Sequence, residues 1–190
     1  RYLSSIGFKG RIEGLEFYEI NEHNTFQDAE KIVQVLIEGE DMALISEAGL
    51  PAVADPGANL VDLAHRNDID VIPFVGPSSL MMALMSSGMN GQCFAFNGYL
   101  PVKPNERKGK IKELEKRSKV ARQSQIFIET PYRNDAMFGD VLEVCDPSTK
   151  VCVAADITLP SAFIRTRSVQ QWRQNKISIG KRPCVFIIMG

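Results

Sequence analysis

The chain has no long apolar run and very little histidine. No run approaches the roughly 18 apolar residues that a membrane-spanning helix needs, so no membrane partner is expected. The first residues, RYLSSIGFKG, lack the apolar core of a secretory signal. His23 and His65 are the only histidines, and they form no spacing typical of a metal site or of a serine–histidine–aspartate triad. We therefore expect no bound metal.

Nucleotide-binding fingerprints and paired cysteines are missing as well. The sequence contains neither GxGxxG nor GxxxxGK[ST], so a dinucleotide-binding fold or a P-loop has no support. The cysteines show no CxxC spacing, and each lies in or near an apolar run: Cys93, Cys145, Cys152 and Cys184. This pattern favours buried, reduced thiols in a cytoplasmic protein over metal or redox chemistry.

What the chain does have is a large apolar fraction and an uneven distribution of charge. Hydrophobic residues make up 44% of its 190 residues, enough for the core of one large domain or two small ones. Residues 1–102 carry 14 acidic and 5 basic side chains, whereas residues 103–190 carry 9 acidic and 17 basic ones. The split predicts two parts, of which the second faces an anionic partner.

Strand and helix signals alternate along the first half. We predict strands at 14–20, 41–46 and 70–74, and helices over 26–39, 58–67 and 78–88. This alternation predicts an α/β fold with a mostly parallel sheet and helices on both faces. The breaker cluster GMNGQ marks a boundary between an N-terminal α/β domain, 1–90, and a C-terminal α/β domain, 91–190. In the second half we predict a helix near 134–144 and strands at 93–101, 125–129, 151–156, 162–169 and 183–190.

Three loops that contain proline follow predicted strands: SEAGLPAVADPG (46–57), VGPSSLMMA (75–83) and IETPYRN (128–134). In an open parallel sheet, ligands bind beyond the carboxyl ends of the strands, where these loops are expected. Ser78 and Ser79 lie at a predicted helix start, whose free N–H groups favour a polar or anionic ligand. Taken singly, each loop is more typical of an ordinary turn or helix cap.

A basic stretch opens the second half. The segment KPNERKGKIKELEKRSKVAR (103–122) holds nine Lys/Arg and three Glu. A solvated helix surface is one explanation of such a run of charge. A patch that follows the phosphates of a nucleic acid is the other, because clustered cations neutralise backbone charge whatever the sequence.

Four segments, in this order, resemble the bacterial 16S rRNA ribose 2′-O-methyltransferase I family: SEAGLPAVADPG, PFVGPSSLMMALMSSG, FNGYLPVKPNER and IFIETPYR. NEHN at 21–24 fits the same pattern. The family belongs to the class III, tetrapyrrole methylase-like, S-adenosylmethionine-dependent methyltransferases. The resemblance therefore implies a two-domain α/β fold with the cofactor in the cleft between the domains. Loops at strand ends would hold S-adenosyl-L-methionine largely through backbone groups, whose close approach Gly and Pro permit.

The resemblance also implies roles for particular residues. Glu129 is the first choice for the base that removes the ribose proton, and a structural use of this carboxylate is equally open. The expected cofactor contacts are Gly49, Leu50, Pro51, Val53, Ser78, Ser79, Ile128, Glu129, Pro183 and Cys184. The expected substrate contacts, which include the basic stretch, are His23, Asn24, Lys108, Lys110 and Arg133.

Two departures from the family pattern matter. The family's opening strand and turn would precede Arg1, and the chain has no initiating Met, so we expect it to be part of a longer gene product. A family Glu-Leu-Thr-Lys segment reads DITLPSAF here, with Leu159 at the lysine position. Two alternatives therefore stay open: a methyltransferase acting on a tetrapyrrole or a protein side chain, and a non-catalytic RNA-binding paralogue. The resemblance implies a homodimer whose partner is small-subunit rRNA or a ribosomal particle.

Overall fold

The computed structural model of the chain describes residues 2–21 and 26–190. Contacts divide the chain into unit 1, Arg1–Gly76, and unit 2, Pro77–Gly190. The division falls before helix α4 (Ser79–Ser87), which sequence analysis assigned to the first domain, because α4 packs against strands of unit 2. The predicted domains, 1–90 and 91–190, stay a prediction for the whole protein.

Unit 1 is built on two helices that pack against each other. After α1 (Tyr2–Ser5) and the 3-10 turn η1 (Ile12–Gly14) come α2 (Phe26–Ile37) and α3 (Ala58–Arg66). In each helix the apolar residues recur at helical spacing, so one face is available for burial. Those faces form a core from Ala29, Ile32, Val33, Leu60 and Leu63.

The three strands predicted for the first half are not formed in the described part of unit 1. Residues 15–20, 41–46 and 70–74 lie outside helices and outside any ladder. A strand needs hydrogen bonds to a neighbouring chain segment, and none of these segments pairs with another. Many of their apolar side chains are exposed, including Ile72 at 73% and Phe74 at 89%, whereas Ile20 and Met42 are partly buried against the core of the two helices. The predicted parallel sheet of the first half is therefore wrong for these residues.

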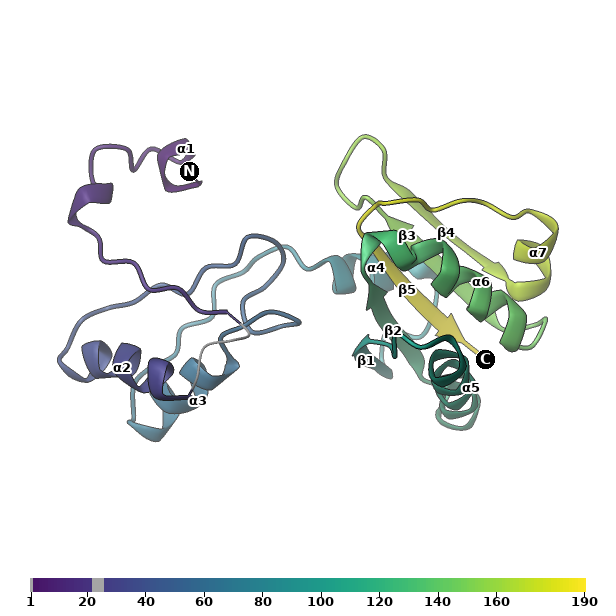
Figure 1. Cartoon of the computed structure of the whole chain (residues 1–190), viewed down its shortest axis with the longest axis horizontal. Helices are drawn as coiled ribbons and strands as arrows, with labels where there is room; N and C mark the ends of the chain where they lie inside the picture. Colours follow the sequence, from purple (N-terminus) through teal and green to yellow (C-terminus); the bar gives the residue numbers. More distant parts are fainter. Residues whose placement is uncertain (1, 22–25) are drawn as a thin grey trace. The chain divides into compact units, whose positions relative to one another are not determined.

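Unit 2 carries a sheet of five strands, and here the predicted elements are confirmed (Figure 1). The helices that flank it are α5 (Pro104–Ala121), α6 (Asn134–Val144) and α7 (Val169–Gln174), with a 3-10 turn η2 (Pro131–Arg133) before α6. The strands are β1 (Phe94–Tyr99), β2 (Ser124–Glu129), β3 (Lys150–Ala155), β4 (Phe163–Ser168) and β5 (Cys184–Met189). They lie in the order β1-β2-β5-β3-β4.

The sheet is mixed and not mostly parallel. Only β1 and β2 pair in parallel, and β5 runs antiparallel to both of its neighbours, β2 and β3. β3 and β4 are also antiparallel, because the connection between them, 156–162, is too short for a crossover. The C-terminal strand β5 therefore lies in the middle of the sheet and pairs with β2 on one side and with β3 on the other.

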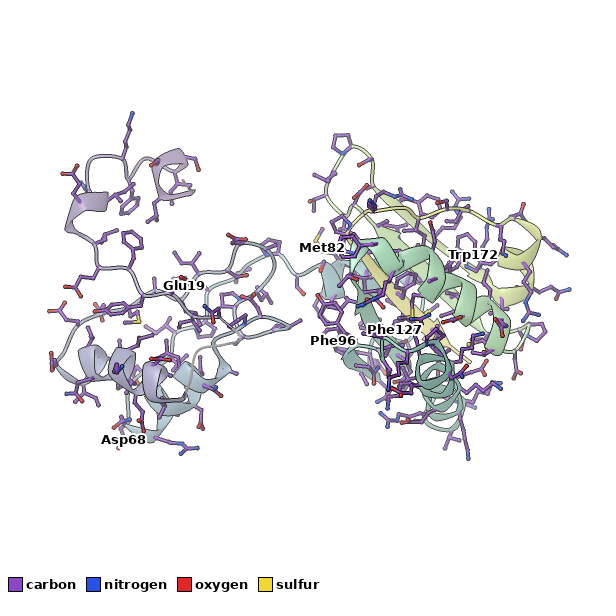
Figure 2. The ribbon with its side chains drawn as sticks, viewed as in Figure 1. Glu19, Asp68, Met82, Phe96, Phe127 and Trp172 are labelled. Atoms are coloured by element: carbon purple, nitrogen blue, oxygen red, sulfur yellow. The ribbon has the colours of Figure 1, made fainter. Side chains whose placement is uncertain are left out.

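Helices cover both faces of this sheet, as predicted. One face packs under α5, α6 and α7, where Phe127 stacks on Phe186 with ring centroids 5.6 Å apart. Trp172, labelled in Figure 2, lies on the same side. It meets Phe138 edge-on at 5.3 Å and donates its indole N–H to the Val151 carbonyl at 2.9 Å. The other face packs under α4 through Leu80, Ala83 and Leu84.

A buried ion pair joins α5 to α6. The side chains of Arg107 and Asp140 are 4% and 12% exposed, and Arg107 Nε donates to Asp140 Oδ2 at 2.7 Å. Arg107 Nη1 also donates to the Val102 carbonyl at 2.9 Å. A charge this deeply buried is tolerated because it is paired and hydrogen-bonded. Arg107 belongs to the basic stretch of the sequence, yet in the structure it holds two helices together.

Three of the four cysteines are buried, and none of the four forms a disulfide. Burial raises the pKa of the thiols of Cys145 and Cys184 to about 12 and raises that of Cys152 as well. At pH 8 these groups stay protonated, and only the thiolate is a good nucleophile. Brief iodoacetamide treatment of the folded protein is therefore expected to modify Cys93, which is partly exposed, and to spare the other three.

Peptide mass spectrometry checks this pattern, with the urea-unfolded protein as the control in which all four cysteines react. The same pKa shifts predict an alkaline limit to stability. Their contribution is complete below pH about 9, where the unfolded thiols are protonated, and is lost as the pH rises toward about 12. Rapid alkylation of Cys145 in the folded protein would contradict the assignment.

Candidate functional site

Several predicted site residues meet at one edge of the unit 2 sheet. Glu129 ends β2 and is paired with Cys184, the first residue of β5. Cys184 is paired on its other side with Ala155, which ends β3. The Asp156 amide then donates to the Pro183 carbonyl at 3.0 Å. The sequence placed these residues in three separate segments, and the sheet brings them side by side.

The Glu129 carboxylate is fully buried and asymmetrically bonded. Oε1 accepts from the Thr130 amide at 2.7 Å and from Arg133 Nε and Nη2 at 3.0 and 2.7 Å. Oε2 is also buried and has no hydrogen-bond partner in the structure. The first oxygen therefore fixes the turn η2, whereas the second is a free acceptor whose burial is costly unless a donor reaches it.

Arg133 is held by that carboxylate rather than free to move. Its hydrogen bond to Glu129 raises its pKa, against the opposing effect of burial. The guanidinium uses Nε and Nη2 on Glu129, and the side chain is still 32% exposed. Five N–H donors are available on an arginine, so donors remain for a phosphate.

Asn134 lies beside this pair and was not singled out in the sequence. Its Nδ2 donates to the carbonyls of Gly180 and Arg182 at 3.0 and 2.7 Å, which ties the start of α6 to the loop that leads into β5. Its Oδ1 is buried and has no hydrogen-bond partner among residues 2–21 and 26–190. The signal for it was local, since an Asn directly after Pro-Tyr-Arg stands at a predicted helix start. Glu129 and Asn134 thus each hold a buried oxygen to which no group in the described part of the chain donates.

Loop 46–57 of unit 1 is a tight turn, held by a local hydrogen bond at Ser46 and by the positive φ of Gly57. Ser46 Oγ both donates to the Ala48 carbonyl at 2.9 Å and accepts from its amide at 3.3 Å. Gly57 has φ 129°, and a Cβ there would come within 2.7 Å of Leu44. A Cβ on Gly76 would come within 3.1 Å of Leu50. Loop 46–57 and the start of loop 75–83, two of the predicted cofactor loops, therefore lie close to each other at Leu50 and Gly76.

The remaining residues expected in this loop lie at or near its surface. Val53 is 45% exposed, and Gly49 has φ 80° and nothing within 4 Å of the position of a Cβ. Leu50 and Pro51 are partly buried. Open space around Gly49 fits a loop that a ligand could approach, but a turn explains it equally well.

Ser78 caps α4, as its position predicted. Its Oγ accepts from the Met81 amide at 3.4 Å, and α4 ends at Gly88 in the left-handed conformation. Ser79 begins the helix and is exposed. The free N–H groups of this helix start are available to a polar ligand.

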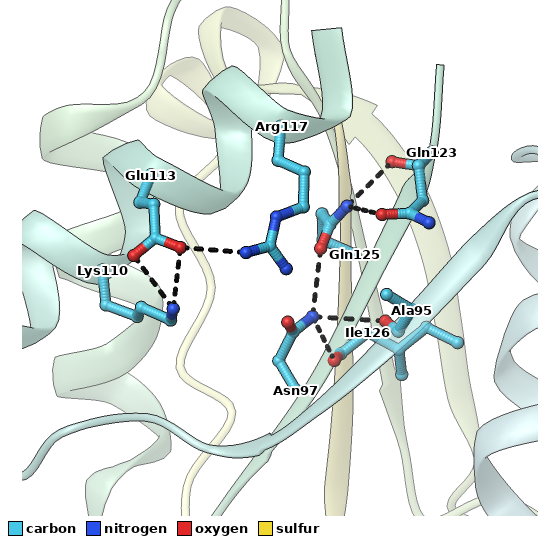
Figure 3. A network of polar contacts seen from close by, with 8 residues as sticks. All are labelled: Ala95, Asn97, Lys110, Glu113, Arg117, Gln123, Gln125 and Ile126. Atoms are coloured by element: carbon cyan, nitrogen blue, oxygen red, sulfur yellow. Dashed lines mark hydrogen bonds and ion pairs between the residues drawn. The ribbon is translucent and has the colours of Figure 1, made fainter. Parts of the chain in front are cut away.

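The lysines expected to bind substrate are paired within unit 2. Lys108 lies 2.8 Å from Glu143 and 3.7 Å from Asp140, and its hydrogen bond to Glu143 raises its pKa. Lys110 is 2.9 Å from Glu113, which also binds Arg117 at 3.1 Å (Figure 3). A phosphate would have to compete with these carboxylates, which lowers the gain from each contact.

Some predictions fall outside what the structure tests. His23 and Asn24 lie outside the described residues. Over residues 2–21 and 26–190, no three or more His, Cys, Asp or Glu are arranged to hold a metal ion. No helix in that part of the chain has the length and apolar character to cross a bilayer.

Comparison with curated proteins identifies relatives. The ribosomal RNA small subunit methyltransferase I of Vibrio cholerae is 35% identical over 141 residues, which are 74% of this chain and 48% of that protein. The protein of that name from Neisseria meningitidis serogroup A is 38% identical over 156 residues, or 82% and 50%. The one from Thermotoga maritima is 36% identical over 146 residues, or 76% and 63%. The chain is homologous to the ribosomal RNA small subunit methyltransferase I proteins.

This homology confirms the resemblance drawn from the motifs. The chain spans about half the length of the first two curated relatives described above. The crystal structure of the methyltransferase CobJ superposes with a TM-score of 0.62 at 17% identity, covering 97% of this chain and 80% of that one. At this identity the likeness concerns the fold, and the predicted α/β, class III methyltransferase fold is confirmed. A comparison with protein-family models found no match.

For a relative of the methyltransferase I proteins, the sheet edge is the best-defined part of the candidate site. The structure brings together Ile128, Glu129 and Cys184, which sequence reasoning had named from distant segments. Lys108 and Lys110 are engaged by carboxylates on α5 and α6. The assigned roles of all these residues stay predictions.

Proposed function

We propose that this chain belongs to an S-adenosylmethionine-dependent methyltransferase that methylates the 2′-hydroxyl of a ribose in small-subunit rRNA. The observation that carries the proposal is the match to relatives named ribosomal RNA small subunit methyltransferase I over 74% and 82% of the chain. The fold shared with the methyltransferase CobJ supports methyl transfer as the reaction type.

The residues at the sheet edge fit the proposed cofactor chemically. S-Adenosyl-L-methionine carries amino and hydroxyl donors, and Glu129 Oε2 is a buried acceptor to which no described residue donates. Ile128 and Cys184 would line the same edge, with Pro183 just before β5. We include in the proposal the contacts expected from Gly49, Leu50, Pro51, Val53, Ser78 and Ser79, and the cleft in which both domains contribute.

The protein's task in this reaction is positioning and proton removal. When bound, S-adenosyl-L-methionine supplies a methyl group on a positively charged sulfur. The chain must align the ribose oxygen in line with that methyl group and exclude competing water. It must also accept the hydroxyl proton or relay it to a base. Glu129 remains the candidate base, but the four-donor environment of Oε1 favours a positioning role.

The proposed substrate and partners follow from the same relationship. Arg133 keeps donors available and would contact a phosphate, with His23 and Asn24 as further expected contacts. Lys108 and Lys110 are retained as weaker candidates because each already has a carboxylate partner. We also propose a homodimer in the cytoplasm that acts on naked rRNA or on a ribosomal particle.

The direct test is transfer of a labelled methyl group by the full-length protein to small-subunit rRNA or to small ribosomal subunits. Label is expected in dinucleotides that survive alkaline hydrolysis, because a 2′-O-methyl group removes the nucleophile needed for strand cleavage. Ser78→Phe is expected to abolish cofactor binding, measured by calorimetry, and with it methyl transfer. Its bulk would block the helix start, while the loss of the cap would cost only about 0.5–2 kcal/mol.

Ser78→Thr is the matched control, because it keeps a capping hydroxyl and should bind the cofactor. The fluorescence of Trp172, the single tryptophan, shows that each variant is folded. Normal binding of S-adenosyl-L-methionine by folded Ser78→Phe would reject the assignment of this helix start. Absence of label in any RNA substrate would reject the proposed reaction.

A second function has one observation in its favour. The segment DITLPSAF forms a tight turn, in which Asp156 and Thr158 have positive φ values of 51° and 78° and Leu159 is 52% exposed. An exposed apolar residue at the family's lysine position suits a non-catalytic RNA-binding paralogue. RNA binding and cofactor binding without turnover on any RNA would favour that reading. Label in a tetrapyrrole or in a protein side chain would instead support the other alternative substrates.

A further inference from the structure

The last part of the chain is purely cationic. Residues 157–190 contain six basic side chains and no acidic one. The basic stretch at 103–122 is different, because most of its cations have a carboxylate within 4.0 Å: Lys103, Arg107, Lys108, Lys110, Arg117 and Lys119. Most cations of α5 are therefore neutralised by carboxylates, so the candidates for unneutralised positive charge are those on β4 and in the loop before β5.

Two arginines flank one aromatic ring in this region. The guanidinium carbons of Arg165 and Arg182 lie 6.0 and 5.9 Å from the ring centroid of Phe163. Neither has a carboxylate at ion-pair distance in the described residues. A guanidinium that rests on a ring keeps its N–H groups directed outward, where they suit phosphate oxygens.

Asp135, a carboxylate of α6 that interacts electrostatically with Arg182, already accepts hydrogen bonds from the loop before β5. Its Oδ1 accepts from the Ile179 amide at 2.6 Å and its Oδ2 from the Ser178 hydroxyl at 2.8 Å. Arg182 meanwhile donates Nε to the Ile179 carbonyl at 2.6 Å, which fixes the direction of its side chain. The charge of Arg182 therefore remains available on a side chain that is already ordered.

The cations continue along an outer strand. β4 lies at one end of the sheet order, and Phe163, Arg165 and Arg167 alternate along it on one face, opposite Ala155, Val153 and Val151 of β3. Alternate residues of a strand lie about 7 Å apart. Arg167 rests 5.0 Å from the Trp172 ring, so it too is ordered by an aromatic contact. The result is a row of oriented guanidiniums along an extended backbone.

The row begins at the candidate site. Phe163 is paired with Ala155, which is the neighbour of Cys184, and Cys184 is the neighbour of Glu129. An RNA strand that follows the row would therefore lead to the sheet edge proposed to hold the cofactor. An anionic polymer suits this surface better than a single small anion, because the charges are spread along the strand.

We infer that Arg165, Arg167 and Arg182, ordered by Phe163 and Trp172, bind the phosphates of a single-stranded segment of the substrate RNA. The inference rests on the proposed function and names where the RNA lies. It places the main phosphate contacts on β4 and the loop before β5, and not on the basic helix α5.

The test measures affinity for a labelled small-subunit rRNA fragment across a salt series, with the full-length protein. Arg165→Gln/Arg182→Gln is expected to lower the slope of log affinity against log salt by about 1.4, or about 0.7 for each lost contact. The matched control is Lys112→Gln/Lys116→Gln, which removes two cations of α5 that have no ion pair among the described residues. The control slope is expected to stay at the wild-type value.

Arg165→Gln alone is the second variant, because it leaves Arg182 and the loop that carries it unchanged. The Arg165 side chain is exposed and lies over the Phe163 ring, so this variant should fold and lose about 0.7 in slope. Unchanged cofactor affinity in calorimetry confirms that the site is intact. A wild-type slope in both arginine variants overturns the inference, as does an equal loss in the lysine control. If the wild-type protein methylates RNA, such a result leaves the proposed function standing. If the wild type binds no RNA, both fail.

Discussion

Asp140→Ala is expected to lower the free energy of unfolding by about 3–5 kcal/mol. The substitution leaves Arg107, whose side chain is 4% exposed, without its counter-charge between α5 and α6. The Arg107 bond to the Val102 carbonyl would remain, but a neutral carbonyl does not replace a carboxylate. Urea unfolding followed through the fluorescence of buried Trp172, which packs against α6 through Phe138, measures the loss.

Glu143→Ala is the matched control, since it removes a carboxylate that is 63% exposed and pairs with Lys108. Surface ion pairs contribute about 0–1 kcal/mol, so this variant should unfold nearly as the wild type does. Arg107→Leu/Asp140→Leu removes both charges and is expected to recover much of the stability. Equal stability of Asp140→Ala and Glu143→Ala would show that the buried Arg107–Asp140 ion pair does not stabilise the packing of α5 against α6.

Glu129→Gln is expected to lower the free energy of unfolding by about 1–3 kcal/mol and to weaken cofactor affinity about tenfold. The amide keeps the shape of the side chain but removes the charge that holds Arg133 at 2.7 Å. It also makes one terminal atom a donor, either at the position of buried Oε2 or toward Arg133. Calorimetry with S-adenosyl-L-methionine and urea unfolding give the two quantities separately.

The kinetic result separates positioning from base catalysis. A positioning role predicts that kcat/KM falls with the weakened cofactor affinity while the pH profile keeps its shape. A general base predicts wild-type cofactor affinity, a kcat lower by about 10²–10⁴ and loss of the limb of the pH profile that reports the carboxylate. Arg133→Gln/Glu129→Gln should restore part of the lost stability if the two residues act as a pair. Wild-type stability and cofactor affinity of Glu129→Gln would reject the positioning role, and a wild-type kcat and pH profile would reject the general base.

The elements of the second half were predictable because their signals are local. The α6 bounds agree with the predicted helix near 134–144, and all five strands follow from short apolar runs bounded by Gly, Pro or Asp. The direction in which those strands pair was not predictable. β5 enters between β2 and β3, and no periodicity in the chain encodes that choice.

In the first half, local sequence signals predicted the helices correctly but not the strands. Its helices α2 and α3 form as expected, since each needs only its own backbone and one apolar face. Its predicted strands depend on hydrogen bonds from another segment, and none of these pairs with another among the described residues. A helix is a local structure and a strand is not, so equal sequence signals gave unequal outcomes.

By itself the sequence determined the family relationship, the second-half elements and the segments that carry Glu129 and Cys184. Only the tertiary structure decided which side chains meet and which charges are free. Lys108 is neutralised by Glu143 and Asp140, which lie on a different helix, whereas Arg165 is paired with no carboxylate in the described residues. The physical reason is that ion pairs and burial depend on distance in space, and a run of charge in the sequence contains no information about the carboxylates that fold against it.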